Sequence, residues 1–366
     1  MFPEVIVSGS PYERGRQYGT QARDRVRRSI TSYAEHYDYY AGWDWSRSRR
    51  EAMRFLPAIS DFAPAQVDEL RGLAAGAEVD LDDIVALNIR TEVLYSAYVR
   101  NAGELNAPDE CSAFGCAAPG RHVVVGQNWD WSPFALDTVV VLRSTPDDGP
   151  AFVTVVEAGL LMKFGVNSDG LALMTNALGS SEDLGEVGVP YHVVLRALIG
   201  CADVDEALKR IDESVRASSA NYLLADTTGA VVDIEARPGD GARVHRLERD
   251  ERGVLLHTNH FVSPGFDALD YKDMVPTTTD LRLERFAEIV HAADDVSDTA
   301  LYERALTDHT NAPGSVCRHT DHTLPEPDQS MTVAAAIVDL TDRRLLVAEG
   351  PPCEHGFEPV AWPGTA

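Results

Sequence analysis

The residue pattern of the chain changes at Cys111, and this change limits the possible folds more than any other feature of the sequence. Before it, apolar residues recur at helical spacing, as at Val67, Leu70 and Leu73. The pattern predicts helices over residues 10–39 and 50–56, a third that starts at residue 63, and a fourth that runs from residue 80 through 93. The first 110 residues are therefore expected to be mostly α-helical.

After Cys111, short β-rich runs separated by turn residues predict strands instead. They lie at residues 122–126, 138–143, 152–156, 162–166, 171–176, 222–225, 231–235, 244–247, 254–257, 332–338 and 345–348. Helices are expected in between, at residues 190–199 and after the capping box formed by Asp203 and Glu206. Strands, then helices, then strands again favour an α+β fold with two packed antiparallel sheets and helices on their outer faces. Residues 351–366 are expected to form an irregular tail.

The chain is strongly acidic, with 32 Lys and Arg against 58 Asp and Glu and a formal charge of −26. Nucleic acids and anionic membranes require clustered basic residues, so neither is expected as a partner. Solubility alone is a sufficient explanation for the acidity. Residues 1–5 have no basic segment and no apolar one, and no run approaches the ~18 apolar residues of a membrane span. We therefore expect a cytoplasmic location.

Five cysteines are too few and too scattered for a disulfide framework in 366 residues, and an odd number leaves at least one free thiol: Cys111, Cys116, Cys201, Cys317 and Cys353. Two histidine pairs, His257 with His260 and His319 with His322, have a spacing typical of zinc ligands. No set of cysteines or carboxylates completes either pair in the sequence. There is also no glycine-rich phosphate-binding pattern. No metal and no nucleotide-type cofactor are therefore predicted.

Cys111 has the chemistry of a nucleophile if the peptide bond before it is cut. An unperturbed thiol, with a pKa of about 8.5, is only slightly ionised at neutral pH. Cleavage would free the α-amino group of the same residue, which has a reference pKa of about 8 and can take the thiol proton. Taken alone, however, a cysteine in a cytosolic chain is more often a small buried apolar residue.

A series of ordered motifs along nearly the whole chain favours the nucleophile. They are Gly9-Ser10-Pro11-Tyr12-Glu13-Arg14-Gly15, Cys111-Ser112-Ala113-Phe114, Gly126-Gln127-Asn128-Trp129-Asp130, Glu157-Ala158-Gly159, Gly165-Val166-Asn167-Ser168-Asp169-Gly170, Thr175-Asn176-Ala177-Leu178, Gly188-Val189-Pro190, His257-Thr258-Asn259-His260 and Ser315-Val316-Cys317-Arg318. Together they resemble the acyl-coenzyme A:6-aminopenicillanate (isopenicillin N) acyltransferase family, peptidase family C45.

The resemblance implies an N-terminal nucleophile hydrolase fold with four αββα layers, made as a precursor that cuts itself before the cysteine. Residues 1–110 would be a helical leader that remains as an α-subunit, and residues 111–366 the catalytic β-subunit, within one compact unit. Cys111 would take the acyl group of a small amide or acyl thioester and pass it to an amine or to water. The implied co-substrate is an acyl-coenzyme A or acyl-carrier thioester, with no other cofactor.

The resemblance also assigns three further site residues. Asp130, nineteen residues after Cys111, matches the aspartate that holds the amino group of the cysteine. Asn259 matches the asparagine of the oxyanion hole, and Arg318 matches an arginine whose charge lowers the pKa of the thiol. Asn176 is a weaker candidate for polar support.

Glu110 is a departure from the family pattern, because the penicillin acyltransferase carries glycine at this position. A bulky anionic side chain here disfavours the strained attack of the Cys111 sulfur on the carbonyl before it. If Cys111 keeps its peptide bond, its nitrogen is an amide and cannot act as a base. A second interpretation therefore stays open, in which the chain is an uncleaved binding or assembly protein that retains the fold.

Overall fold

Two β-sheets form the centre of the protein in a computed structural model, which describes residues 1–101, 111–266, 270–274 and 277–365. The first sheet contains, in spatial order, β1 (Glu4–Gly9), β4 (Val139–Pro146), β5 (Phe152–Glu157), β6 (Phe164–Asn167), β7 (Ala172–Ala177), β8 (Ala220–Ala225), β9 (Val231–Ala236) and β10 (Val244–Leu247). The second contains β11 (Val254–His257), β2 (Cys111–Ala117), β3 (Val123–Trp131), β12 (Met331–Asp339), β13 (Arg344–Glu349) and β14 (Glu358–Val360).

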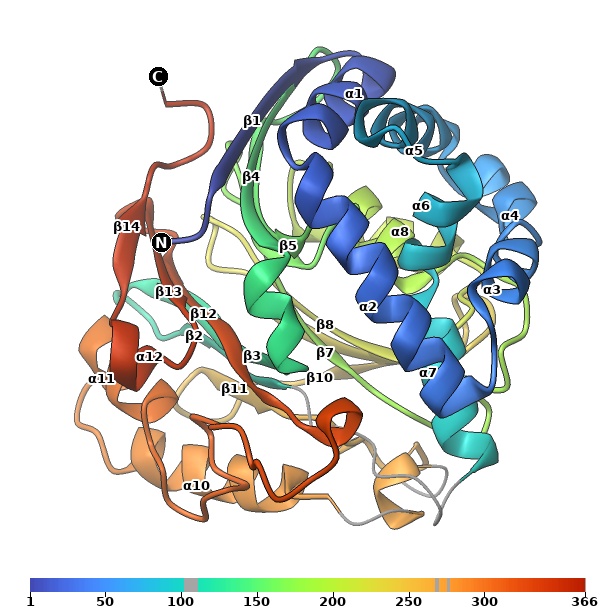
Figure 1. Cartoon of the computed structure of the whole chain (residues 1–366). Helices are drawn as coiled ribbons and strands as arrows, with labels where there is room; N and C mark the ends of the chain where they lie inside the picture. Colours follow the sequence, from blue (N-terminus) through green and yellow to red (C-terminus); the bar gives the residue numbers. More distant parts are fainter. Residues whose placement is uncertain (102–110, 267–269, 275–276, 366) are drawn as a thin grey trace.

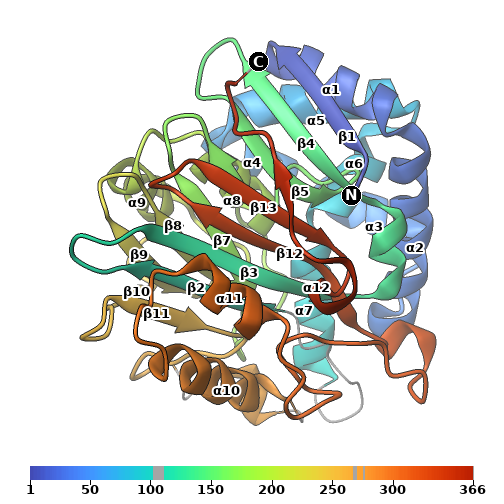
Figure 2. The same ribbon diagram turned by 90° about the vertical axis from the view of Figure 1, so that its left-hand side faces the viewer.

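Helices cover the outer faces of both sheets, which completes four layers (Figure 1). One layer holds α1 (Pro11–Gln21), α2 (Arg23–Ala41), α3 (Trp45–Ala52), α4 (Leu56–Phe62), α5 (Pro64–Ala77), α6 (Leu81–Asn88), α7 (Arg90–Arg100), α8 (Tyr191–Leu198) and α9 (Val204–Glu213). The other holds α10 (Thr279–His291) and α11 (Thr299–Leu306), which Figure 2 shows against the six-stranded sheet. Short elements are α12 (Pro352–His355) and the 3-10 turns η1 (Pro133–Asp137), η3 (Tyr271–Asp273) and η4 (Glu326–Asp328). The predicted αββα arrangement is confirmed.

The six-stranded sheet has two differently packed faces, because successive side chains of a strand point to opposite sides. Cys111, Ala113 and Trp129 point inward and join the main core between the sheets. Phe114 and its neighbours on the other face join a second cluster with the helices α10 and α11. In that cluster the rings of Phe114 and Tyr302 are stacked, with centroids 3.6 Å apart. The side chain of Cys111 is therefore enclosed between the two sheets.

Several local predictions are wrong. The helix predicted over residues 10–39 is two helices, separated at Ala22, and the one predicted from residue 80 breaks at Ile89. Neither break has a glycine or proline at the junction, so the sequence carries no signal for it. The helix predicted at residues 50–56 falls across the end of α3, the following turn and the first residue of α4. The helices α10 and α11 were not predicted.

The two ends of the chain also differ from the prediction. Residues 1–110 contain a strand, β1, which pairs in parallel with β4, so the eight-stranded sheet is not entirely antiparallel. Its residues alternate between exposed and buried, as expected of a half-buried edge strand. The tail after residue 351 is not irregular throughout, because it includes α12 and β14. The strand β14 pairs with β13 and so extends the six-stranded sheet. Within the described part of the chain, no helix combines the length and apolar character needed to cross a lipid bilayer.

The segment before Cys111 shares its core with the rest of the chain. Besides the pairing of β1 with β4, the Tyr33 hydroxyl donates a 2.7 Å hydrogen bond to the buried carboxylate of Glu157. Arg90 lies 3.5 Å from the other oxygen of Glu157. Asn88 donates to the carbonyl of Gly159 at 2.8 Å. Contacts of this kind are buried and polar, so separating the two parts would expose unpaired charges.

Helices α1 and α5 approach each other unusually closely, through two glycines on each. A methyl group added at Gly15 would lie 2.0 Å from the Glu69 carbonyl oxygen, and one at Gly72 would lie 2.0 Å from that of Tyr12. Gly19 and Gly76 are equally constrained, with contacts of 2.2 and 2.1 Å. All of these contacts are to backbone atoms, which cannot rotate away. The two helices can reach this spacing only without side chains at the contact.

We expect Gly72→Ala to lower the free energy of unfolding by about 1–3 kcal/mol or more, because α1 and α5 must move apart to admit the methyl group. Urea denaturation followed by circular dichroism measures the change. Gly149→Ala is the matched control, since a methyl group there meets no atom within 4 Å. It should change stability by less than about 0.5 kcal/mol. Equal effects of the two substitutions would contradict the close contact.

Candidate active site

Cys111 is the first residue of β2 and lies opposite Trp129 of β3. It is fully buried, and strand alternation directs its side chain between the sheets. Gln127 projects from the same face, and its Nε2 lies 4.0 Å from the Cys111 sulfur. The Oε1 of Gln127 accepts a 2.8 Å hydrogen bond from the backbone nitrogen of Thr175, in the opposite sheet. That bond fixes the Gln127 amide with its N–H groups toward the sulfur.

The backbone nitrogen of Cys111 donates a 2.7 Å hydrogen bond to Oδ1 of Asn259. The same oxygen accepts a second bond, of 2.9 Å, from Nη2 of Arg282. The Nδ2 of Asn259 donates to the carbonyl of Ala177 at 3.0 Å. Two donors on one side and a carbonyl on the other determine which way the amide points. Asn259 is therefore held with its oxygen toward the nitrogen of the cysteine.

Arg282 of α10 is a site residue that the sequence did not reveal. Its side chain is 1% exposed, and Nη1 hydrogen-bonds both the carbonyl oxygen of Cys111 and, at 3.1 Å, the hydroxyl of Ser112. One guanidinium thus contacts Cys111, Ser112 and Asn259 together. The spacing of residues in the sequence could not predict this contact, because it depends on how α10 packs against β2.

Asp130 and Arg318 lie close to each other on the face of the six-stranded sheet opposite the Cys111 side chain. The Oδ2 of Asp130 lies 3.7 Å from Nε of Arg318. The hydroxyl of Thr332 joins the pair, because it donates to Asp130 at 2.6 Å and accepts from the backbone nitrogen of Arg318 at 2.9 Å. Trp129 is the strand partner of Cys111, and Asp130 is the next residue of the same strand. The side chains of Cys111 and Asp130 therefore point to opposite faces of the sheet.

The predicted roles of these residues remain predictions. Asn259, which was expected to donate an N–H to the oxyanion, here donates from Nδ2 to the Ala177 carbonyl and accepts at Oδ1 from the Cys111 nitrogen. Asn176 supports the site indirectly, since its Nδ2 donates to the Thr258 carbonyl at 3.0 Å and so holds the peptide that precedes Asn259. Glu110, the residue of the expected cleavage, lies outside the described residues.

A buried lysine occupies the inner face of the site near Trp129. The Nζ of Lys163 lies 5.7 Å from the centroid of the Trp129 ring and 3.5 Å from the hydroxyl of Tyr191. Trp129 is the strand partner of Cys111, so this cation lies on the side of the sheet toward which the sulfur points. Lys163 was not predicted as a site residue, because an isolated lysine before a strand carries no signal of burial.

A charged network supports the loop that carries Asn259. Nε2 of His257 lies 3.0 Å from Glu235 Oε1, and Nδ1 lies 2.7 Å from the carbonyl of Thr258. Burial alone would lower the pKa of His257, but the carboxylates of Asp233 and Glu235 outweigh it and raise that pKa. Burial raises the pKa of Asp233 to about 6. Burial likewise acts to raise the pKa of Glu235, but hydrogen bonding to His257 and to the Ser263 and Val262 backbone holds it below its ordinary value.

His257 and His260, the first of the two histidine pairs with zinc-like spacing, each bind protein side chains instead of sharing one site. His257 lies against Glu235, whereas Nδ1 of His260 lies 2.9 Å from the Thr279 hydroxyl and Nε2 lies 3.2 Å from Asp280. The two imidazoles serve separate hydrogen-bond networks on either side of Asn259. Both networks hold this loop in place beside Cys111.

Comparison with known proteins identifies the family of the chain. The family described as acyl-coenzyme A:6-aminopenicillanic acid acyl-transferase matches residues 116–353. The chain belongs to this family. The match begins after Cys111 and includes Asp130, Asn259 and Arg318. This acyl-transferase family member is therefore an enzyme of the acyltransferase or hydrolase class.

Two relatives extend over most of the chain. The acyl-coenzyme A:6-aminopenicillanic-acid-acyltransferase 40 kDa form of Emericella nidulans is 24% identical over 322 residues, which are 86% of this chain and 84% of the relative. The β-alanyl-dopamine/carcinine hydrolase of Drosophila melanogaster is 24% identical over 328 residues, with coverage of 81% and 83%. One relative is named as an acyltransferase and the other as a hydrolase.

Two solved structures resemble this chain with low sequence identity and low TM-scores. Penicillin V acylase from Agrobacterium tumefaciens has 16% identity and a TM-score of 0.44, over 65% of this chain and 83% of the acylase. A mutant of conjugated bile acid hydrolase from Clostridium perfringens has 13% identity and a TM-score of 0.44, over 69% of this chain and 98% of the hydrolase. At this level the likeness carries no information on activity.

We expect His257→Gln to lower the free energy of unfolding by about 3–5 kcal/mol at pH 6, because Glu235 and Asp233 lose their buried counter-charge. The pKa of His257 is raised in the folded chain above the reference value of about 6.5. Its contribution is therefore complete below that value and is lost as the pH rises through the folded pKa. Urea denaturation of both proteins between pH 6 and pH 9 should show the difference shrinking. A difference in unfolding free energy that does not change with pH would contradict the raised pKa of His257. His322→Gln, at an exposed histidine, is the control.

Proposed function

We propose that this chain is a cysteine N-terminal nucleophile enzyme, activated by cutting its own chain before Cys111. It takes the acyl group of a small amide or acyl thioester as a thioester on Cys111 and transfers it to a small amine or to water. The observation that carries the proposal is the hydrogen bond between the Cys111 nitrogen and Oδ1 of Asn259. It joins the residue that would supply both nucleophile and base to a fixed polar partner.

In the activating step, the Cys111 sulfur attacks the carbonyl carbon of Glu110. The C–N bond breaks, the proton of the thiol passes to the Cys111 nitrogen, and a thioester links residue 110 to the sulfur. Water then hydrolyses this thioester, which leaves a carboxylate on residue 110, a free thiol and a free α-amino group on Cys111. The amide nitrogen has thereby become a base.

In the catalytic cycle, the α-amino group accepts the proton of the thiol, and the sulfur attacks the acyl carbonyl of the substrate. The tetrahedral intermediate collapses as the amino group returns the proton to the leaving group, which forms the acyl thioester. An amine or a water molecule then gives a proton to the same α-amino group and attacks the thioester. The product leaves, and the sulfur regains its proton.

Asn259 suits the base of this cycle, because its fixed side-chain oxygen accepts an N–H of the Cys111 nitrogen and so orients that nitrogen. The buried guanidinium of Arg282 adds a fixed positive charge beside Cys111 as negative charge develops on the substrate. Gln127, whose Nε2 faces the sulfur, is a candidate N–H donor in the same space.

Asp130 and Arg318 keep their proposed roles as polar support for the Cys111 amino group and thiol. Their contacts to Thr332 tie them to β12, next to the strand that pairs with Cys111. Asn176 holds the peptide before Asn259, so we propose it as a positioning residue. The roles of Asp130 and Arg318 rest on the resemblance of their motifs and on the chemistry of charged hydrogen bonds, and that of Asn176 rests on its contact with the Thr258 carbonyl.

Both transfer and hydrolysis fit the proposal, since one full-length relative is named as an acyltransferase and the other as a hydrolase. Their named substrates are small molecules that carry or receive an acyl group on an amine. We therefore propose a small linear amide, or an acyl thioester with an amine, as the substrate class. Acyl-coenzyme A is the proposed co-substrate where transfer occurs.

We also propose that residues 1–110 remain bound after cleavage. The strand β1 belongs to the same sheet as β4, and Glu92 of α7 accepts hydrogen bonds from the Tyr191 nitrogen at 2.7 Å and the Ser218 hydroxyl at 2.8 Å. Losing this segment would strip one edge of the eight-stranded sheet and leave buried polar groups unpaired. The leader is then a permanent subunit.

We expect the purified protein to run on a denaturing gel as two fragments, residues 1–110 and 111–366, with Cys111 as the new N-terminus by sequencing. Native mass spectrometry should find both fragments in one particle. Cys111→Ala should remain full length, since no other atom can replace the attacking sulfur.

Cys116→Ala is the matched control, because Cys116 lies on the same strand with its side chain in the second cluster, away from Cys111. It should cut itself as the wild type does. A wild-type chain that stays intact while it turns over an amide would rule out the α-amino base and leave only the nucleophile. An intact and inactive wild type would favour the binding or assembly interpretation.

A further inference from the structure

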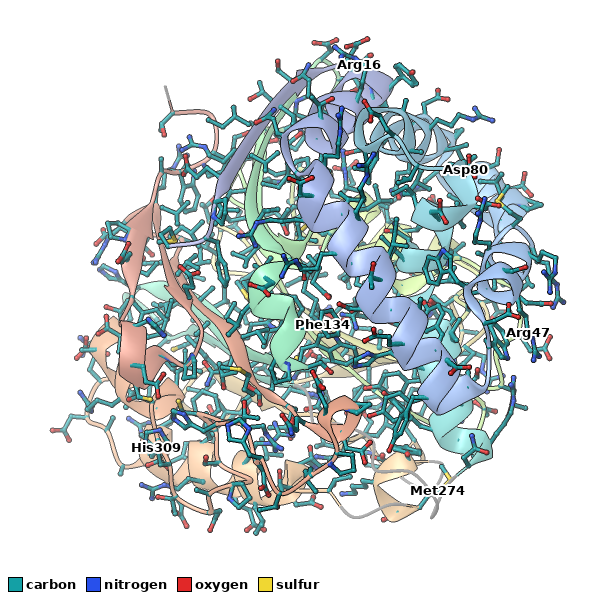
Figure 3. All side chains as sticks on the ribbon, in the orientation of Figure 1. Arg16, Arg47, Asp80, Phe134, Met274 and His309 are labelled. Atoms are coloured by element: carbon teal, nitrogen blue, oxygen red, sulfur yellow. The ribbon has the colours of Figure 1, made fainter. Side chains whose placement is uncertain are left out.

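Four side chains with metal-binding atoms meet beside α12, the short helix that packs against β12 and β13. They are His309 and His319, Cys317 and Cys353, and their ligand atoms all lie within 4.8 Å of one another. His309, Cys317 and His319 come from the connection between α11 and β12, and Cys353 from α12. Figure 3 labels His309 in the corner of the molecule where α11 and α12 lie.

Three of the distances between these atoms are close to the edges of a tetrahedron around one ion. The two sulfurs of Cys317 and Cys353 are 3.6 Å apart, and the Nε2 atoms of His309 and His319 are 3.0 Å apart. The Cys353 sulfur is 3.3 Å from Nε2 of His319. Zinc bonds of about 2.3 Å to sulfur and 2.0–2.1 Å to nitrogen place tetrahedral ligand atoms about 3.3–3.8 Å apart. Each measured distance is within a few tenths of an ångström of that range.

A neighbouring carboxylate supports one of the imidazoles. Glu354 Oε1 lies 3.4 Å from Nδ1 of His319, whose Nε2 faces the other three ligand atoms. A histidine that binds a metal through one nitrogen usually donates its other N–H to a carboxylate, which fixes the tautomer. Glu354 is close enough to His319 Nδ1 to take this part when a metal is bound.

We propose that His309, Cys317, His319 and Cys353 bind one zinc ion as a structural site. Two thiols and two imidazoles form a ligand set that zinc prefers over harder cations, and four protein ligands leave no position for a substrate. Both thiols lose their protons to water on binding, so the two thiolates balance the charge of the ion.

The proposed ion would tie the C-terminal segment to the candidate active site. Arg318, which faces Asp130, lies between the two ligands Cys317 and His319. Cys353 lies in α12, four residues after the end of β13, so binding would join this part of the chain to the loop that carries Arg318. A metal at this place would restrict the backbone of Arg318 without touching the reaction itself. The proposal is independent of whether Cys111 is a nucleophile.

A covalent alternative uses the same sulfurs. A disulfide between Cys317 and Cys353 would require the sulfurs to approach to about 2.05 Å, whereas they are 3.6 Å apart. It would also leave His309 and His319 without a shared partner. Counting thiols therefore separates the two arrangements, because a zinc site leaves both cysteines reduced once the metal is removed.

The full-length protein, purified without chelator and passed through gel filtration, should retain about one zinc per chain by elemental mass spectrometry. Cys353→Ser and His309→Ala should lose the bound metal, whereas His322→Ala, in an exposed residue of the same connection, should retain it. Cobalt(II) added to the metal-free wild type should give the visible absorption bands of a tetrahedral site with thiolate ligands, and these bands should be absent in Cys353→Ser.

Cys111→Ala tests whether the nucleophile contributes to the metal, and it should bind zinc as the wild type does. Removing zinc should lower the thermal midpoint of the wild type, while the midpoint of Cys353→Ser should not respond. Only background zinc in the wild type, equal binding by Cys353→Ser, or two missing thiols from a Cys317–Cys353 disulfide would each overturn the proposal.

Discussion

The hydrogen bond from the Cys111 nitrogen to Oδ1 of Asn259 is the contact on which the candidate site depends. It fixes one substituent of the Cys111 α-carbon, and the pairing of β2 with β3 fixes the direction of the side chain. The orientation of Asn259 is in turn set by Arg282 and by the carbonyl of Ala177. The position of the sulfur therefore follows from backbone and amide groups rather than from a flexible side chain.

The residues of the candidate site lie on both faces of the six-stranded sheet. The inner face carries Cys111, Gln127 and Trp129 in the space between the sheets. The outer face carries Asp130 with Arg318, and it is backed by α10 and α11. Arg282 of α10 reaches the carbonyl of Cys111 and so connects the outer helical layer to the nucleophile. A change in how α10 packs would therefore be felt directly at Cys111.

Much of the fold was predictable because local pattern and global layers agree. The bounds predicted for β10 and β11 are those observed, and the helices that begin at residue 64 and after Asp203 were placed correctly. The break between α1 and α2 at Ala22 was not predictable, since it has no local signal. The parallel pairing of β1 with β4 was missed as well, because it joins segments that are far apart in the chain.

The candidate site was predictable in part for the same physical reason. Residues in ordered motifs, such as Cys111, Asp130 and Asn259, stand out in the sequence. Arg282 does not, because its position under Cys111 arises only when α10 packs on the sheet. The cluster around His319 was missed because the sequence pairs it with His322, whereas the fold brings Cys353 to it from another part of the chain. Long-range contacts of this kind have no signature in local spacing.

In the proposed mechanism Cys111 carries the acyl group, and a trapped intermediate tests this most directly. The protein would be incubated briefly with an acyl-coenzyme A or a small acyl amide, quenched in acid to preserve a thioester, and analysed by intact and peptide mass spectrometry. We expect a mass increase equal to the acyl group, located on Cys111, sensitive to hydroxylamine and absent from Cys111→Ala. Turnover by Cys111→Ala at the wild-type rate, or an acyl group found on a different residue, would contradict the account.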